Sequence, residues 1–203
     1  MKKIDYKKEL KQRYAPSSRK VEIVDVPRMN FLMVDGEGDP NTAKSFSDAI
    51  ETLYPLAYTL KFMIKQGTMG IDYGVLPLEA LWWADDMSAF TTGNKDAWKW
   101  TVMIMQPDFI TTAMVAEATK EVQRKKKPVA LPLVRFEAFN EGKAAQILHI
   151  GPFSSEGPTI EKVHAFIADN GSQRRGKHHE MYLSDMRRTA PEKWKTIVRQ
   201  PME

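Results

Sequence analysis

The sequence predicts a mixed α+β protein built from two related halves. Short runs that alternate apolar and polar residues, the pattern of half-buried strands, are separated by longer segments with helical spacing of apolar residues. The order strand, glycine turn, helix, glutamate-bearing strand occurs twice along the chain. We therefore expect one domain over residues 1–203, with half-repeats at about 21–106 and 129–185.

Composition narrows the class of protein. With 203 residues, 42% of them hydrophobic and 28% charged, the chain can bury a sizeable core. It has no apolar run of membrane-spanning length, and its charged start lacks the apolar region of a signal peptide. We expect a cytoplasmic protein with no membrane partner. Because cysteine is absent, disulfides, thiolate nucleophiles and cysteine-based metal centres are excluded.

The positive charge is modest and scattered. The formal net charge is +4, and the basic residues form short clusters such as Arg124–Lys127 and Arg174–Lys177. Such clusters are typical of solvated helix ends and turns, and they are not interleaved with aromatic residues along one strand. We expect no nucleic-acid partner.

The first half begins with a polar lead-in over residues 1–20, where a short helix is expected. Residues 21–26 and 31–34 are predicted as two strands separated by a turn at Pro27. A long helix then ends near Gly67. Proline removes a helical hydrogen bond, so Pro55 should kink or divide this helix.

The strand from Leu78 to Trp83 carries a carboxylate among apolar and aromatic residues. Side chains alternate on a strand, so Glu79, Leu81 and Trp83 share one face. A bare charge on such a face costs several kcal/mol unless it gains a proton, a donor or a cation. We interpret Glu79 as a polar anchor of a ligand-binding cleft.

The rest of the chain repeats this order. A strand at 98–105 leads to a helix that ends at Arg124–Lys127. The second half then has strands at 134–140 and 144–150 around a turn at Glu141-Gly142, a helix that ends at Asn170-Gly171, and a strand at 179–183. A capping-box pattern at 189–192 predicts a C-terminal helix over 189–199. Two halves packed as pseudo-twofold partners would bring their glutamate-bearing strands toward one shared cleft.

Four motifs give the chain a family resemblance. They are Pro77-Leu78-Glu79 through Trp83, His149-Ile150-Gly151-Pro152-Phe153, His179 through Asp185, and Arg188 through Pro201. With these motifs the sequence resembles the GyrI-like small-molecule-binding family, and it is most similar to the stand-alone bacterial members. The resemblance implies two strand–helix–strand–strand units (SHS2-like repeats) that form an antiparallel sheet, with helices on one side and a ligand groove on the other.

The resemblance also implies a site. The glutamate of the C-terminal half falls on Glu180, and the Leu-Glu-x-Leu-Trp-Trp motif falls on Leu78 to Trp83, with Ala80 where glycine is expected. In regulators of this kind a glutamate in an aromatic pocket receives cationic, lipophilic drugs. Some stand-alone members hydrolyse the cyclopropane of cyclopropanoid DNA alkylators, which is a detoxification reaction.

Glu180 and Tyr182 are the candidate catalytic residues. They lie two apart on a strand and so share a face. Glu180, as a carboxylate of raised pKa, would orient and deprotonate water, and Tyr182 would hydrogen-bond a substrate carbonyl that gains charge. An ion pair between Glu180 and either Arg187 or a nearby lysine is the structural alternative.

Four residues are candidates for ligand binding, and each has a structural alternative. Glu79 could instead make a buried hydrogen bond, and aromatic residues on strands often pack in a core. The candidates are Glu79, Trp83, Tyr73 and Trp100.

No metal or other cofactor is expected. Adjacent strand residues point to opposite faces, so His178 and His179 should not ligate one ion, and no third ligand follows at a suitable spacing. Three functions stay open at this point: a hydrolase of strained rings, a non-catalytic protein that sequesters lipophilic aromatic compounds, and a gyrase-inhibitor-like interaction module.

Overall fold

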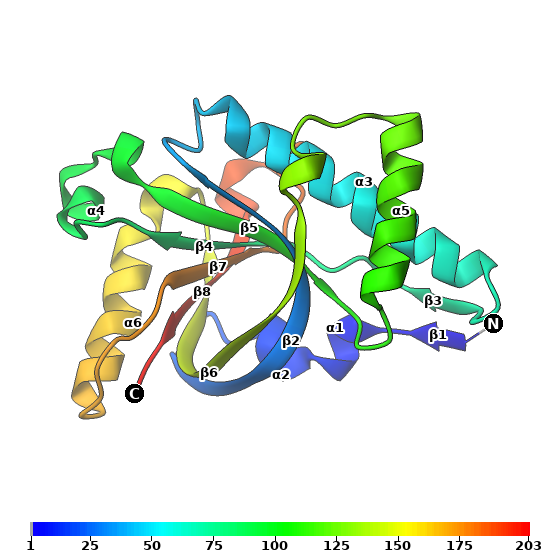
Figure 1. Ribbon diagram of the computed structural model, residues 1–203. Helices are drawn as coiled ribbons and strands as arrows, with labels where there is room; N and C mark the ends of the chain where they lie inside the picture. The colour runs from blue at the N-terminus through cyan, green and yellow to red at the C-terminus, as the bar shows by residue number, and fades with distance from the viewer. Residues whose placement is uncertain (1) are drawn as a thin grey trace. The chain divides into compact units, whose positions relative to one another are not determined.

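The computed structural model describes residues 2–203 of the chain, in which helices and strands are mixed (Figure 1). The strands are β1 (Lys2–Ile4), β2 (Glu22–Glu37), β3 (Ile71–Tyr73), β4 (Leu78–Trp83), β5 (Lys99–Gln106), β6 (Arg135–Ile150), β7 (His178–Tyr182) and β8 (Lys195–Pro201). The α-helices are α1 (Tyr6–Glu9), α2 (Lys11–Tyr14), α3 (Lys44–Gln66), α4 (Ser88–Thr92), α5 (Thr112–Lys125) and α6 (Gly157–Asp169). None of the helices described is both long and apolar enough to cross a membrane.

The longer strands form one closed sheet with the hydrogen-bonded order β2–β5–β4–β7–β8–β6. Strand β5 is antiparallel to β2, and β8 is antiparallel to both β6 and β7. The short strands β1 and β3 pair with each other in parallel. The predicted α+β fold with an antiparallel sheet is confirmed.

The chain divides into two compact units. Unit 1 comprises the residues up to Tyr6 together with 29–78 and 82–139, and unit 2 comprises residues 7–28, 79–81 and 140–203. Strands β2, β4 and β6 each contribute residues to both units. The short central piece of β4 that belongs to unit 2 contains Glu79.

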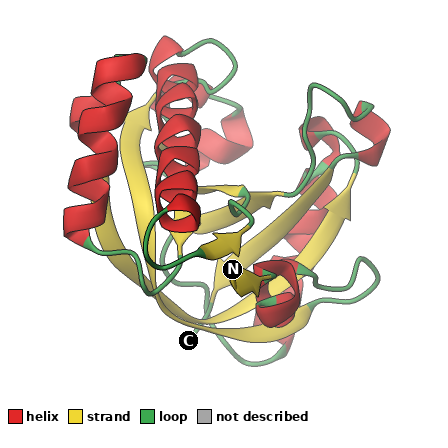
Figure 2. Cartoon of the chain, turned by 90° about the vertical axis from the view of Figure 1, so that its right-hand side faces the viewer, coloured by secondary structure: helices red, strands yellow, loops and turns green. Residues whose placement is uncertain are grey.

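The core of unit 1 is built on a close contact between a glycine and a tryptophan. Helices α3 and α5 pack against each other (Figure 2), and Phe31 and Trp100 are almost fully buried. A Cβ atom on Gly36 would lie 2.2 Å from the Trp100 ring, so only glycine fits at this position of β2. Trp100 therefore packs directly on the backbone of the neighbouring strand.

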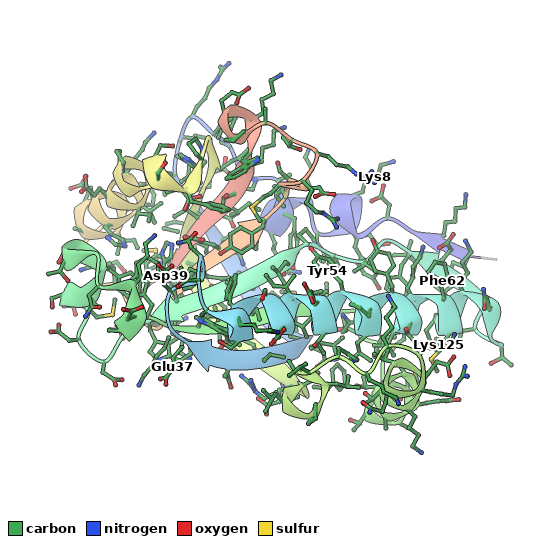
Figure 3. All side chains as sticks on the ribbon, turned by 90° about the horizontal axis from the view of Figure 1, so that it is seen from above. Lys8, Glu37, Asp39, Tyr54, Phe62 and Lys125 are labelled. Atoms are coloured by element: carbon green, nitrogen blue, oxygen red, sulfur yellow. The ribbon has the colours of Figure 1, made fainter. Side chains whose placement is uncertain are left out.

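Helix α3 is continuous over 23 residues and contains Pro55, so the prediction that Pro55 divides it is wrong. One missing backbone donor costs less than the burial of the helix face that carries Leu53, Leu56 and Leu60, all of them fully buried. On another face the rings of Tyr54, Tyr58 and Phe62 follow one another along the helix (Figure 3).

Strands β2 and β6 are each 16 residues long, and both turns predicted inside them are wrong. Pro27 lies within β2, because its fixed φ is compatible with an extended chain. In β6 Gly142 has a φ of 71°, as at a bulge, and the strand continues past it. The preceding residue, Glu141, is buried.

The predicted C-terminal helix over 189–199 is also wrong. Only Pro191–Lys193 forms a single 3-10 turn, and β8 follows it. Residues of β8 hydrogen-bond with β6 on one side and β7 on the other, and this pairing between distant parts of the chain overrides the local capping pattern.

Unit 2 has its own core between α6 and β8 (Figure 1). Val163 and Ile167 of α6 contact Val198 of β8 in a cluster that leaves almost no exposed surface. The full cluster comprises Val21, Ala145, Ile147, Val163, Ile167, Val198 and Met202.

Candidate functional site

Strand β7 gives unit 2 two different polar faces. Side chains alternate along it, so His178, Glu180 and Tyr182 share one face and His179 lies on the other. The hydrogen bonds agree with this pattern: His178 and Tyr182 contact Glu180, whereas His179 contacts Glu79 and Glu141. The prediction that the two histidines point to opposite faces is confirmed.

Glu180 is held as a carboxylate by two neighbours on its own strand. His178 Nε2 lies 3.1 Å from Glu180 Oε1, and the Tyr182 hydroxyl donates to Oε2 at 2.7 Å. Burial alone would raise the pKa of Glu180, but the hydrogen bonds from His178 and Tyr182 hold it below the usual value, so the prediction of a raised pKa for Glu180 is wrong. Only 12% of the Glu180 side chain is exposed.

A second carboxyl group, Glu156, lies next to Glu180. Glu156 immediately precedes α6 and is only 4% exposed. Burial, together with the charge and hydrogen bonding of Glu180, raises the pKa of Glu156 to about 9. Glu156 is therefore protonated at neutral pH. Its Oε1 atom has no hydrogen-bond partner among residues 2–203.

Aromatic rings adjoin these carboxyl groups. The Phe153 ring lies 5.6 Å from that of Tyr182 and 5.1 Å from that of Trp194, centroid to centroid. Phe153 is 39% exposed, so part of this ring is accessible to a ligand. We call Glu156, His178, Glu180 and Tyr182, together with the rings of Phe153 and Trp194, the glutamate site.

Two further histidines lie in the same part of unit 2. His149 Nδ1 is 2.9 Å from the Thr159 hydroxyl, which ties β6 to the first turn of α6. His164 on α6 is 3.0 Å from the Arg174 guanidinium. Burial, Arg174 and His178 lower the pKa of His164 to about 4, so it is neutral and can accept this hydrogen bond.

The opposite face of β7 carries a buried ion network of five side chains: Tyr14, Glu79, Glu141, His179 and Arg199. His179 Nε2 lies 2.9 Å from Glu79 Oε2, and His179 Nδ1 lies 2.8 Å from Glu141 Oε1. Arg199 donates to Glu141 Oε2 at 2.9 Å, and the Tyr14 hydroxyl donates to Glu79 Oε1 at 2.5 Å.

The charges of the network stabilise one another. Burial alone would lower the pKa of His179, but Glu141 and Glu79 raise it to about 9. Burial alone would raise the pKa of Glu141, but His179 and Arg199 hold it at about 2. His179 and Arg199 are therefore cations whose charges are offset by buried carboxylates.

The network also holds the N-terminal part of unit 2 in place. Arg199 Nη2 donates to the Arg13 carbonyl at 2.7 Å, and Gln146 donates to the Gln12 carbonyl at 2.7 Å. Because every member is buried and hydrogen-bonded, we assign the network a structural role: it fixes β7, and with it Glu180, in position.

The structure brings together the two predicted catalytic residues, Glu180 and Tyr182. It does not place Glu79 with them. Glu79 bonds to His179, the residue on the other face of β7, so the prediction that Glu79 and Glu180 face one common cleft is wrong. The cost of the buried Glu79 charge is offset by His179 and Tyr14 instead of by a ligand.

The aromatic candidates belong to unit 1. Trp100 has no exposed surface, and Tyr73 is 3% exposed with ring contacts to Tyr6 and Phe109. We assign both to the core. Trp83 is half-buried at the end of β4, and its part in ligand binding stays a prediction.

Each unit also has an open hollow at its surface. The hollow in unit 2 has a volume of about 520 Å³ and begins at Leu183, the residue after Tyr182. It is lined by Ile150, Leu183, Ser184, Asp185, Thr189, Lys193 and Lys195, and none of the residues of the glutamate site lines it. The hollow in unit 1, of about 370 Å³, has an acidic lining that includes Glu37, Asp85, Asp86 and Asp96.

Several residues of the glutamate site and of the buried ion network were not predicted as site residues. Glu156 could have been suspected because it directly precedes the Gly157-Pro158 helix start, a conspicuous place for a buried acid. Trp194 was hidden by the predicted helix over 189–199. Tyr14 and Glu141 lie outside the four motifs and Arg199 lies inside the last of them, but only the fold brings the three together.

A half-buried carboxylate beside aromatic rings, on an α+β fold, has the make-up of a small-molecule-binding domain. The family model described as the GyrI-like small molecule binding domain matches residues 19–202. The chain therefore belongs to the GyrI-like family. No curated protein is a significant match.

Two solved structures from Listeria innocua are similar over almost the whole chain. One, described as an uncharacterized conserved protein, has 43% identity and a TM-score of 0.90, covering 98% of this chain and 100% of the other. The second, described as a hydrolase, has 43% identity and a TM-score of 0.89, with 100% of each chain covered. The EcmrR C-terminal domain shares the fold at 14% identity and a TM-score of 0.55, covering 91% of this chain and 97% of the other.

Proposed function

We propose that the glutamate site binds flat, lipophilic aromatic compounds and hydrolyses strained electrophilic rings in them, such as the cyclopropane of cyclopropanoid DNA alkylators. The observation that carries the proposal is Glu180, a half-buried carboxylate kept ionised by His178 and Tyr182. A carboxylate that is fixed, ionised and poorly hydrated can act as a general base. The similar Listeria innocua protein described as a hydrolase supports this reaction class.

The rings of the site suit a planar ligand. Phe153 is 39% exposed, and its ring contacts the rings of Tyr182 and Trp194. Stacking on such rings would hold a flat compound by apolar contact, with little dependence on its detailed substituents. The same rings would attract a cation above their faces.

The reaction is a hydrolysis in which water is the only co-reactant. Glu180 removes a proton from water as the water oxygen attacks a ring carbon. The carbon–carbon bond of the strained ring breaks, and its electron pair moves through the conjugated system to the carbonyl oxygen. The product is a ring-opened alcohol.

The hydrogen bond between Tyr182 and Glu180 changes the role that we expect for Tyr182 in the reaction. A phenol has one proton to donate, and Tyr182 donates it to Glu180 at 2.7 Å. We therefore assign Tyr182 the task of orienting the Glu180 carboxylate, in place of direct contact with the substrate carbonyl.

The test uses a synthetic probe in which a cyclopropane is conjugated to a carbonyl on a fused aromatic ring system. Purified protein should convert it to a product heavier by one water, and mass spectrometry of the product in ¹⁸O-labelled water should show the label. Recovery of intact probe from a protein that binds it would overturn hydrolysis and identify a sequestering protein. Absence of binding would overturn both.

A further inference from the structure

Glu156 is a buried acid that the proposed hydrolysis does not yet use. It lies where the loop after β6 enters α6, and only 4% of its surface is exposed. An acid in so enclosed a position needs either a cation or a proton of its own. Its close neighbour is another carboxyl group, Glu180, so it meets no compensating cation there.

Two carboxyl groups in contact cannot both ionise without a large cost, so they share one proton. The surroundings decide which group keeps it. Glu180 accepts hydrogen bonds from His178 and Tyr182, which favour its charged form. For Glu156, burial and the charge of Glu180 outweigh the one hydrogen bond, from Thr196, that favours the charged form, and its Oε1 atom has no partner among the residues described. The proton therefore resides on Glu156.

Hydrolysis of a strained ring requires both a base and an acid. Water loses a proton as it attacks, and the carbonyl oxygen of the substrate gains negative charge. Tyr182 already donates its single proton to Glu180. The proton of Glu156 lies in its hydrogen bond with Glu180, and it is released from that bond when Glu180 takes a proton from water. The unpartnered Oε1 of the same carboxyl group is available to a bound oxygen atom that can then receive it.

We propose that Glu156 is the acid partner of Glu180 and delivers its proton to the substrate oxygen that becomes charged as the ring opens. This inference rests on the proposed hydrolysis. Glu180 takes one proton from water, and Glu156 gives one to the product oxygen. After the reaction Glu180 is protonated and Glu156 is ionised. Transfer of the proton from Glu180 to Glu156 across their contact restores the starting protonation states. No oxidant or reductant is needed.

The proposal assigns a pH dependence. The rate should fall as pH rises through about 9, the pKa of Glu156, because burial and Glu180 hold the proton there up to that pH. Other titratable groups lie near the pair, and their titration must be distinguished from that of Glu156 in the pH profile. They are His178 and Tyr182 on β7, which contact Glu180, and His164 on α6, which interacts with His178 and is paired with Arg174.

The decisive variant is Glu156→Gln. Glutamine has the same shape and the same neutral charge as the protonated acid, so the variant should fold, but it has no proton to transfer. We expect turnover of the cyclopropyl probe to fall about 100-fold or more, a usual contribution of general acid catalysis. The remaining rate should no longer fall near pH 9. Glu156→Asp should recover part of the rate, and Tyr182→Phe should keep the alkaline fall.

Infrared difference spectroscopy provides a readout that does not depend on turnover. The wild type should show a protonated carboxyl band at neutral pH that Glu156→Gln removes and the exposed control Glu161→Gln retains. If the wild type turns over the probe and Glu156→Gln matches it in rate and pH profile, the acid role is overturned while the hydrolysis stands. If the wild type leaves the probe intact, both are overturned.

Discussion

His179 Nε2 lies 2.9 Å from Glu79 Oε2, although the two residues are 100 positions apart in the chain. The contact joins β7 to the central piece of β4 inside unit 2. It explains why a carboxylate is tolerated in a strand of apolar residues, and it places Glu79 on the opposite side of β7 from Glu180. Several predictions about stability depend on it.

Glu79→Leu should lower the free energy of unfolding by about 3–5 kcal/mol, because it leaves the His179 cation without one of its two carboxylates. Urea denaturation followed by circular dichroism measures the change. Glu117→Leu, at an exposed position of α5, is the matched control and should shift stability by about 0.5 kcal/mol or less. Equal effects of the two substitutions would refute the role of the network.

Tyr14→Phe should cost about 1–3 kcal/mol, since it removes only the hydroxyl that donates to Glu79 and leaves the ring in place. Combined with Glu79→Leu it should cost much less than the sum of the two single changes, because both act on one contact. A strictly additive double variant would show that the two side chains are not coupled.

Stability should fall at alkaline pH. The pKa of His179 is raised from an ordinary value near 6.5 to about 9, so its contribution is complete below about pH 6.5 and is lost as pH rises toward 9. The raised pKa of Glu156 causes loss as pH rises from about 4.5 toward 9. The lowered pKa of His164 causes loss as pH falls from about 6.5 toward 4, and the low pKa of Glu141 causes loss as pH falls from about 4.5 toward 2. Urea midpoints measured across this range should therefore be highest near pH 4.5–6.5.

Glu156→Gln isolates the contribution of Glu156 to the pH dependence of stability. The variant has no carboxyl group to titrate, so its stability should fall less steeply between pH 6.5 and 9 than that of the wild type. An unchanged slope would mean that Glu156 is ionised in the folded protein.

Gly36→Ala should destabilise the core of unit 1 by about 1–3 kcal/mol, because the new methyl group would lie 2.2 Å from the Trp100 ring. Thermal unfolding followed by tryptophan fluorescence measures this. Gly74→Ala is the control, since a Cβ atom there meets nothing within 4 Å. If Gly36→Ala were as stable as the control, the close packing of Trp100 on β2 would be disproved.

Phe153→Ala should weaken binding of the flat aromatic probe about tenfold while leaving the charge of Glu180 unchanged. Phe153 is already 39% exposed, so its truncation should have little effect on folding. Equilibrium dialysis of the probe against the wild type and the variant gives the ratio of affinities. An unchanged affinity would place the ligand elsewhere on the protein.

The α+β class, most strands and the pairing of Glu180 with Tyr182 were predictable from the sequence, because they depend on local alternation and on a two-residue spacing. The turns expected at Pro27 and at Glu141-Gly142 were wrong, because a proline and a glycine bulge are both compatible with a continuous long strand. The helix expected over 189–199 was wrong because β8 gains two neighbouring strands that no local pattern reveals.

The site was predictable only in part for a related reason. A strand pattern shows which residues of one strand share a face, but it does not show which residues of other strands and loops they meet. Glu156 reaches Glu180 from the loop before α6, and Glu79 reaches His179 from β4. Whether each acid meets a cation or another acid decides its protonation, and this depends on the folded chain alone.

The most direct test of the central claim is a single-turnover comparison of the wild type with Glu180→Gln on the cyclopropyl probe. Glutamine keeps the size of the side chain and leaves the aromatic rings of the site unchanged, so the variant should still bind the probe. It should open the ring at least about 100-fold more slowly, since it cannot take a proton from water. Ring opening by Glu180→Gln at the wild-type rate would contradict the account.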